Sequence, residues 1–194
     1  VDVVKITSPG GIKAWLVVDK TTPILSISFA FRGSSVRDPK GKEGVAAMVS
    51  GLLDQGAGDL DTQALQSKLE DLSIRFSIRS SRDSMIGSLR TLASRKDEAF
   101  RLFATIMTKP RFDPASVARV RRQYISAAVR SARRPATIAS RTWMRRAFPN
   151  HPYGRSTSGT PKSLAAITVE DLRAFVRQAF ARDNLVVGVV GNVD

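Results

Sequence analysis

The order of two hydrophobic periodicities along the chain constrains the fold most strongly. Residues 24–31 alternate and place Leu25, Ile27, Phe29 and Phe31 on one face, as in a half-buried β-strand. Residues 43–55 instead repeat every three or four positions, as in a buried helix. Blocks of each kind follow one another without regular alternation. This order predicts an α+β fold in which helices pack on one side of a mostly antiparallel sheet.

The other elements follow from the same two periods. Further strands are predicted at residues 12–18, 73–80, 84–92 and 185–190, the last of them fully buried. The turn at residues 81–83 joins two of these strands into a hairpin. Further helices are predicted at residues 61–72, 96–107, 114–133, 135–147 and 168–180, and a short one begins near Pro161.

Capping residues and apolar spacing predict where several of these helices begin and which face of them is buried. Asp61 and Asp113 are expected to be N-caps, and Pro114 suits the first helical position. Residues 168–171 have the form of a capping box. The 96–107 helix is expected to bury a stripe consisting of Phe100, Phe103, Ile106 and Met107.

The composition removes whole classes of chemistry. The 194 residues include no cysteine and one histidine, His151, which rules out thiolate zinc sites, disulfides and cysteine nucleophiles. No apolar run reaches the roughly 20 residues that cross a bilayer. We read residues 1–194 as a single α+β domain. Because the sequence stops directly after a strand, we expect it to be the first domain of a longer chain whose second, similar domain is missing.

The formal charge of +14 is concentrated in the middle of the chain. Residues 95–146 carry 14 Lys and Arg against three Asp and Glu, whereas the flanking segments are nearly balanced. Five arginines form a candidate stripe on one helix: Arg119, Arg122, Arg130, Arg133 and Arg134. The stripe has three readings: a plain charged face, a surface for a peptide or anionic partner, or a nucleic-acid site. Nucleic acid is the least favoured, because aromatic residues are not interleaved for base stacking.

Two loop segments have plain readings. His151 precedes Pro152 in a loop, where local packing is expected instead of a role as base or metal ligand. Residues 156–160 are rich in Ser and Thr but lack the frame of a phosphate-binding loop. We read them as a turn before the helix near Pro161.

Several segments together resemble the N-terminal domain of the insulinase/pitrilysin metallopeptidases. They are the glycine-containing strand end at residues 31–35, the helix region 44–57, His-Pro-Tyr-Gly at 151–154, Gly159-Thr160 and the closing Val-Val-Gly-Asn-Val-Asp at 189–194. In that family the helix carries the inverted zinc motif H-x-x-E-H. The resemblance covers nearly the whole chain, in the same order and spacing.

The zinc chemistry of that family is missing at every expected position. The two histidines fall on Ala47 and Gly51, and the catalytic glutamate falls on Ser50. The third ligand, a glutamate about 76 residues further on, falls near Ala127. These residues supply no imidazole and no carboxylate, so we expect no catalytic residues, no metal ligands and no cofactor.

The resemblance implies a noncatalytic role beside a catalytic relative. In bacterial and mitochondrial versions of the family, one chain holds zinc while a related chain helps form the chamber that encloses a peptide. This chain is therefore read as a zinc-less subunit that gives chamber wall and peptide-binding surface to a zinc-bearing paralogue, or to a homo-oligomer. A periplasmic or exported location is implied, with the cytoplasm left open. The alternatives are a basic module that binds nucleic acid or an anionic partner, and an active peptidase with a relocated site.

Overall fold

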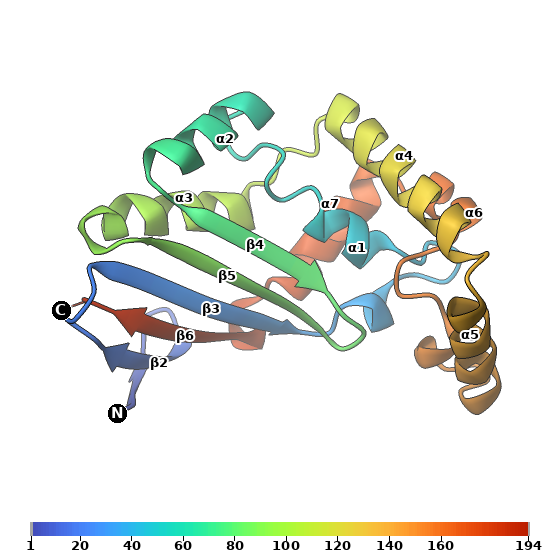
Figure 1. Cartoon of the computed structure of the whole chain (residues 1–194), viewed down its shortest axis with the longest axis horizontal. Coiled ribbons are helices and arrows are strands. Elements are labelled where there is room, and N and C mark those ends of the chain that lie inside the picture. The colour runs from blue at the N-terminus through green and yellow to red at the C-terminus, as the bar shows by residue number, and fades with distance from the viewer. Residues whose placement is uncertain (1, 194) are drawn as a thin grey trace.

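A computed structural model describes residues 2–193 and contains one six-stranded sheet (Figure 1). The strand order across the sheet is β1-β2-β6-β3-β5-β4. The strands are β1 (Val4–Thr7), β2 (Lys13–Val18), β3 (Ile24–Arg32), β4 (Arg75–Ser80), β5 (Ser84–Leu92) and β6 (Leu185–Gly191).

The pairing is mostly antiparallel, as predicted. Strands β4 and β5 form the expected hairpin, and β3 pairs antiparallel with both β5 and β6. The exception is β6, which lies parallel to β2. The short strand β1, which pairs antiparallel with β2, was not anticipated from the sequence. The last strand thus enters the middle of the sheet beside the first strands of the chain.

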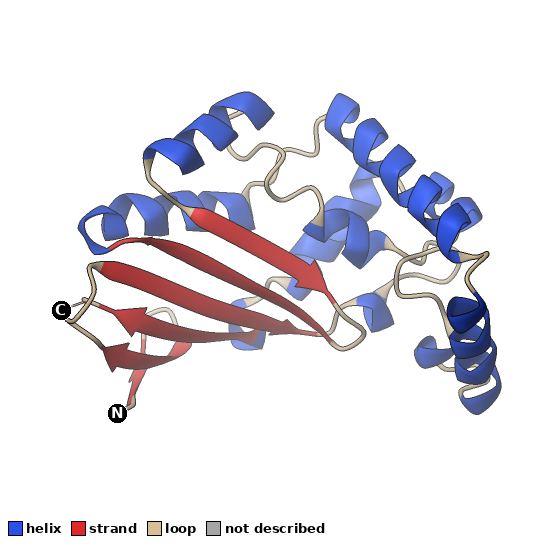
Figure 2. Cartoon of the chain, viewed as in Figure 1, coloured by secondary structure: helices blue, strands red, loops and turns tan. Residues whose placement is uncertain are grey.

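Seven α-helices lie within residues 2–193, and Figure 2 shows most of them on one side of the sheet, with α5 beyond its end. This arrangement confirms the predicted α+β class. Their bounds are α1 (Val45–Ser50), α2 (Thr62–Asp71), α3 (Lys96–Thr108), α4 (Pro114–Ser131), α5 (Pro135–Ala147), α6 (Pro161–Ala166) and α7 (Val169–Ala179). None of the helices in the described part of the chain is both long and apolar enough to cross a membrane.

The core lies between β3 and the helices. The four alternating residues of β3 are all buried, as their period predicts. Phe29 packs against the ring of Phe103 on α3 with centroids 4.9 Å apart, and Phe31 packs against Phe180 after α7 at 4.6 Å. Aromatic contacts of this kind add to the burial of apolar area. The layer of helices is thereby fixed to one face of the sheet.

Two expectations about helix α1 and strand β6 need correction. The helix predicted over residues 43–55 ends at Ser50, whose hydroxyl donates to the Ala47 carbonyl at 2.9 Å. Such back-bonding competes with the helical backbone, and tighter turns carry the chain on to Gly56. Strand β6 is largely half-buried, because the helices cover one face of the sheet.

Two expectations about α3 and α4 were also wrong in detail. Phe100 is 40% exposed, because the inner face of α3 is centred on Ala99, Leu102 and Ile106. Asp113 does precede α4, but its side chain makes no cap hydrogen bond. Its carboxylate accepts instead from Arg111 Nε at 2.8 Å. The charged neighbour therefore competes successfully for the carboxylate.

Candidate functional site

The candidate site is built around the short buried helix α1. Asp38 lies before the helix and accepts hydrogen bonds from the backbone N–H groups of Gly44, at 2.7 Å, and Ala46, at 2.9 Å. The first turn of α1 is thus capped from outside the helix. Gly44 adopts a left-handed φ of +104°, which suits glycine. Burial raises the pKa of Asp38 to about 6, although the two hydrogen bonds and Arg155 act in the opposite direction.

The four positions of the zinc motif are not equivalent in the structure. Ala47 and Ser50 lie on α1, and Gly51 directly follows it. Ala47 is buried, Ser50 and Gly51 are half-buried, and Ala127 lies exposed on α4. Helix α4, which carries Ala127, contacts α1, and its Tyr124 lies beside the Gly51 position.

Tyr124 fills the space beside Gly51. A β-carbon added at Gly51 would lie 2.9 Å from the Tyr124 hydroxyl oxygen and 3.2 Å from a ring carbon. Burial raises the pKa of Tyr124, while a hydrogen bond with Ser50 acts in the opposite direction. A larger side chain at position 51 would therefore have to displace the phenol. The sequence prediction missed this role, although Tyr124 lies one helical turn before Ala127.

A shallow cavity separates the end of α1 from strand β4. Its volume is about 300 Å³, and its walls include Ser50, Gly51 and Asp54 on one side and Phe76–Ile78 on the other. In the sheet formed by residues 2–193, β4 is an edge strand, since β5 is its one partner. The motif positions thus face an open strand edge.

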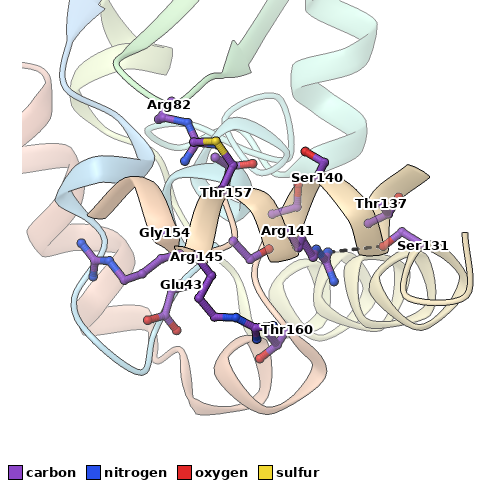
Figure 3. Close-up of a pocket in the computed structure, with 14 residues that line it drawn as sticks. Glu43, Arg82, Ser131, Thr137, Ser140, Arg141, Arg145, Gly154, Thr157 and Thr160 are labelled. Carbon is purple, nitrogen blue, oxygen red and sulfur yellow. Dashed lines mark hydrogen bonds between the residues drawn. The ribbon is translucent and has the colours of Figure 1, made fainter. Parts of the chain in front are cut away.

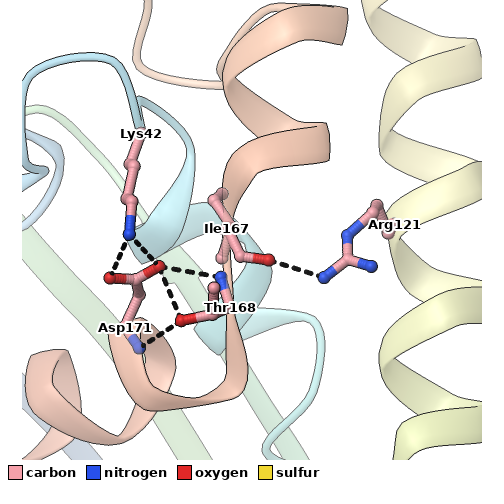
Figure 4. Close-up of polar contacts among 5 residues, drawn as sticks. All are labelled: Lys42, Arg121, Ile167, Thr168 and Asp171. Carbon is pink, nitrogen blue, oxygen red and sulfur yellow. Dashed lines mark hydrogen bonds and ion pairs between the residues drawn. The ribbon is translucent and has the colours of Figure 1, made fainter.

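Contacts around α6 and α7 hold α4 in place (Figure 4). Arg121 on α4 donates to the Ile167 carbonyl at 2.7 Å. Beside it, Thr168 and Asp171 form the predicted capping box of α7, and Lys42 pairs with Asp171 at 2.7 Å. Burial raises the pKa of Asp171, but hydrogen bonds from Lys42 and Thr168 outweigh it and leave that pKa lowered. The start of α7 is therefore anchored from two sides.

The structure divides the predicted arginine stripe into two parts. Arg119, Arg122 and Arg130 line a shallow groove of about 330 Å³ on α4, where Arg119 donates to Gln55 Oε1 at 2.6 Å. Arg133 and Arg134 lie beyond the end of α4, in the link to α5. The five arginines therefore do not form one continuous stripe on a single helix.

His151 lies in a loop and packs locally, as expected. Its Nδ1 accepts from the Tyr153 backbone N–H at 3.2 Å, and its ring lies 4.9 Å from the Tyr153 ring and 6.0 Å from that of Phe148. Among the described residues, no group of three or more His, Cys, Asp or Glu side chains is arranged to hold a metal ion.

Taken together, the fold and motif positions define an insulinase-type α+β domain. A sequence profile of the family described as Insulinase (Peptidase family M16) matches residues 15–161. Since the match covers more than half of the chain, this protein belongs to the M16 family.

Two curated relatives match most of this sequence. One, named "Non-peptidase homolog YmxG", is from Helicobacter pylori and is 25% identical over 171 residues, which are 88% of this chain and 40% of the relative. The other, an uncharacterized zinc protease from Rickettsia felis, is 20% identical over 79% of this chain and 37% of its own length. The chain thus spans less than half the length of these relatives.

Solved structures share the fold. A peptidase M16 inactive domain from Pseudomonas fluorescens aligns over all of this chain and 47% of its own, with a TM-score of 0.94 and 28% identity. A protease from Helicobacter pylori aligns over the same shares with a TM-score of 0.86 and 20% identity. The periplasmic protease PqqL from Escherichia coli aligns over 99% of this chain and 22% of its own, with a TM-score of 0.83 and 16% identity.

Proposed function

We propose that this protein is a noncatalytic member of the M16 family that contributes chamber wall and peptide-binding surface to a zinc-bearing partner. One observation carries the proposal. The scaffold that positions the zinc motif is kept, while Ala47, Ser50, Gly51 and Ala127 stand at the motif's positions. Tyr124 occupies the space that a side chain at position 51 would need.

The chemistry of these residues argues against hydrolysis at this site. A catalytic zinc ion takes three protein ligands and lowers the pKa of its bound water, and a nearby carboxylate or imidazole then moves the proton. Two alanines and a glycine offer no donor atom in their side chains. The remaining hydroxyl, that of Ser50, already donates to the Ala47 carbonyl.

The open edge of β4 supports a peptide-binding role. An extended peptide can add to a sheet edge, where backbone hydrogen bonds supply affinity and neighbouring pockets select side chains. The shallow cavity between α1 and β4 lies along this edge. A peptide held there would pass the motif positions without meeting a metal-bound water.

Two of the similar proteins have names that describe them as noncatalytic. The Helicobacter pylori relative is called a non-peptidase homologue, and the Pseudomonas fluorescens structure is called an inactive domain. Both lend support to a noncatalytic reading of this chain. We also propose a second copy of this chain as an alternative partner, and a periplasmic or exported location.

The decisive experiment mixes the purified protein with a paralogue from the same genome that keeps an intact H-x-x-E-H motif. Peptide cleavage and the mass of the complex in solution are measured with and without this chain. We expect a defined complex and a change in the partner's cleavage rate or peptide preference. Unchanged mass together with unchanged cleavage would overturn the partner proposal.

A further inference from the structure

A second and larger cavity lies beyond the end of β4 (Figure 3). Its volume is about 630 Å³, and it is bounded by helix α5, by the loop at residues 154–160, and by the turn between β4 and β5. We call it the arginine cleft after the four arginines in its walls: Arg82, Arg141, Arg145 and Arg155.

The chemistry of the arginine cleft suits an anion. Four guanidinium groups line it against a single carboxylate, that of Glu43, which accepts a hydrogen bond from the Gly41 backbone N–H. Seven other lining residues are Ser or Thr and add hydroxyl groups. Guanidinium groups bind carboxylates through paired, charge-assisted hydrogen bonds. The lining is therefore cationic and rich in hydrogen-bond donors.

Two of the four arginines support the walls and two are available to a ligand. Arg82 donates to the Tyr153 carbonyl at 2.7 Å, and Arg155 donates to the carbonyls of Asp38 and Val36. In contrast, Arg141 has one long contact, 3.5 Å to a serine hydroxyl, and Arg145 makes no hydrogen bond or ion pair within residues 2–193. Both of these arginines lie on α5, four residues apart, and so on one face of the helix.

The cleft is held in a fixed position relative to β4. Strand β4 ends at Ser80, and the turn that follows is tied to the cleft loop by two contacts. Arg82 donates to the Tyr153 carbonyl, and the Tyr153 hydroxyl donates to Asp83 at 2.8 Å. The Arg82 guanidinium also lies over the Tyr153 ring. A peptide paired with β4 and continuing past Ser80 would therefore reach the arginine cleft.

We propose that the arginine cleft is a carboxylate-binding subsite for an acidic segment of a peptide that lies along β4. The inference rests on the proposed peptide-binding function and adds the charge of the peptide. Aromatic rings are absent from the described lining of the cleft. Single-stranded nucleic acid relies on such rings for base stacking, so an acidic peptide is the better fit.

Fluorescence anisotropy with two short labelled peptides tests the subsite. The peptides share one sequence, except that consecutive Glu residues in the first are Gln in the second. At about 50 mM salt, we expect the Glu peptide to bind at least about tenfold more tightly than the Gln peptide, and we expect this preference to shrink as salt rises.

Paired charge-removing variants locate the effect. Arg141→Gln with Arg145→Gln should weaken binding of the Glu peptide about tenfold or more and leave the Gln peptide nearly unchanged. Arg122→Gln with Arg130→Gln removes the same charge from the α4 groove and is the control. It should change binding by less than about twofold, and circular dichroism should show both variants folded.

Each contrary result has a definite meaning. Equal binding of the two peptides would overturn the carboxylate subsite and leave peptide binding standing. Equal weakening by both variant pairs would reduce the effect to overall charge and overturn the subsite. Tighter binding of a labelled single-stranded oligonucleotide, lost in the Arg141 and Arg145 variant, would assign the cleft to nucleic acid. Failure of both peptides to bind would overturn the peptide-binding function as well.

Discussion

Gly51 is one of the four motif positions that lack a zinc-site side chain, and its surroundings would resist one. The backbone at Gly51 is right-handed, with φ of −81°, so any residue could adopt it without strain. What excludes a side chain there is Tyr124, whose hydroxyl oxygen lies 2.9 Å from the position of an added β-carbon. The motif helix and the helix that would carry the third ligand thus meet through a phenol ring.

Gly51→Ala tests this contact directly. We expect it to lower the free energy of unfolding by about 1–2 kcal/mol, because the new methyl group overpacks against Tyr124. Adding Tyr124→Phe removes the nearest atom and should recover part of the loss in a double-mutant cycle. Gly188→Ala is the control, since its added β-carbon meets only the Ser28 carbonyl, at 4.0 Å. Equal losses at both glycines, measured by urea denaturation, would contradict this role of Tyr124.

The raised pKa of Asp38 leads us to expect that the stability of the protein depends on pH. Its pKa in the folded protein, about 6, lies above the ordinary value near 4 of an unfolded chain. The folded state therefore binds the extra proton between these values, and the stability contributed by Asp38 declines as pH rises from about 4 to about 6. The decline is on the order of 2–3 kcal/mol for the two-unit shift.

Urea denaturation across this pH range compares wild type with Asp38→Asn. The variant keeps one acceptor oxygen toward α1 but cannot titrate, so its stability should lack this decline. Identical slopes in the two proteins would show that Asp38 does not titrate between pH 4 and pH 6.

At the level of helices and strands, the sequence predicts those features that depend on residues close together in the chain. The β3 alternation, the Asp61 cap, the hairpin of β4 and β5 and the capping box at Thr168 all rest on neighbours in sequence, and all are present. Two features could not be predicted from sequence periodicity. Phe100 is exposed because of how α3 packs on the core, and Asp113 makes no cap because its carboxylate accepts from Arg111.

The candidate site shows the same division. The predicted helix over residues 43–55 contained Ala47, Ser50 and Gly51; in the structure the first two lie on α1, and Gly51 directly follows its end. The contact of Tyr124 with the Gly51 position arises from how α4 lies beside α1, and the arginine stripe is divided because α4 ends at Ser131. Such packing between elements that are far apart in sequence cannot be read from the spacing of residues alone.

The capping box of α7 gives a prediction at this scale. Thr168→Ala removes the hydroxyl that accepts from the Asp171 backbone N–H, so it should cost about 1 kcal/mol of stability. Lys42→Met breaks a partly exposed ion pair and should cost less than about 1 kcal/mol. Thermal unfolding of the two variants shows which substitution lowers stability more. A larger loss of stability in Lys42→Met than in Thr168→Ala would contradict the role given to the capping box.

Helix α5 is expected to behave differently from the other helices. None of its 13 residues is buried, and Trp143 is 68% exposed. Trp143→Ala should therefore change stability by no more than about 0.5 kcal/mol, whereas Leu53→Ala in the core should cost about 2–5 kcal/mol. Chemical denaturation compares the two. A large loss of stability in Trp143→Ala would mean that another part of the protein or a second molecule covers α5 in solution.

Across residues 2–193, the protein combines an M16-type α+β domain with motif positions that carry no imidazole and no carboxylate. Strand β4 lies at the edge of the sheet, and the cleft lined by arginines lies beyond the end of that strand. These features support our proposal that the protein holds a peptide which another chain cleaves.

The number of zinc ions bound per chain distinguishes a noncatalytic protein from a zinc peptidase. The protein is incubated with excess zinc, passed through a desalting column and analysed for metal by mass spectrometry, with a motif-containing M16 peptidase as positive control. We expect far less than one bound zinc ion per chain. We also expect this chain alone to show no peptide cleavage that a chelator abolishes. One zinc ion per chain, together with cleavage that a chelator abolishes, would contradict these expectations.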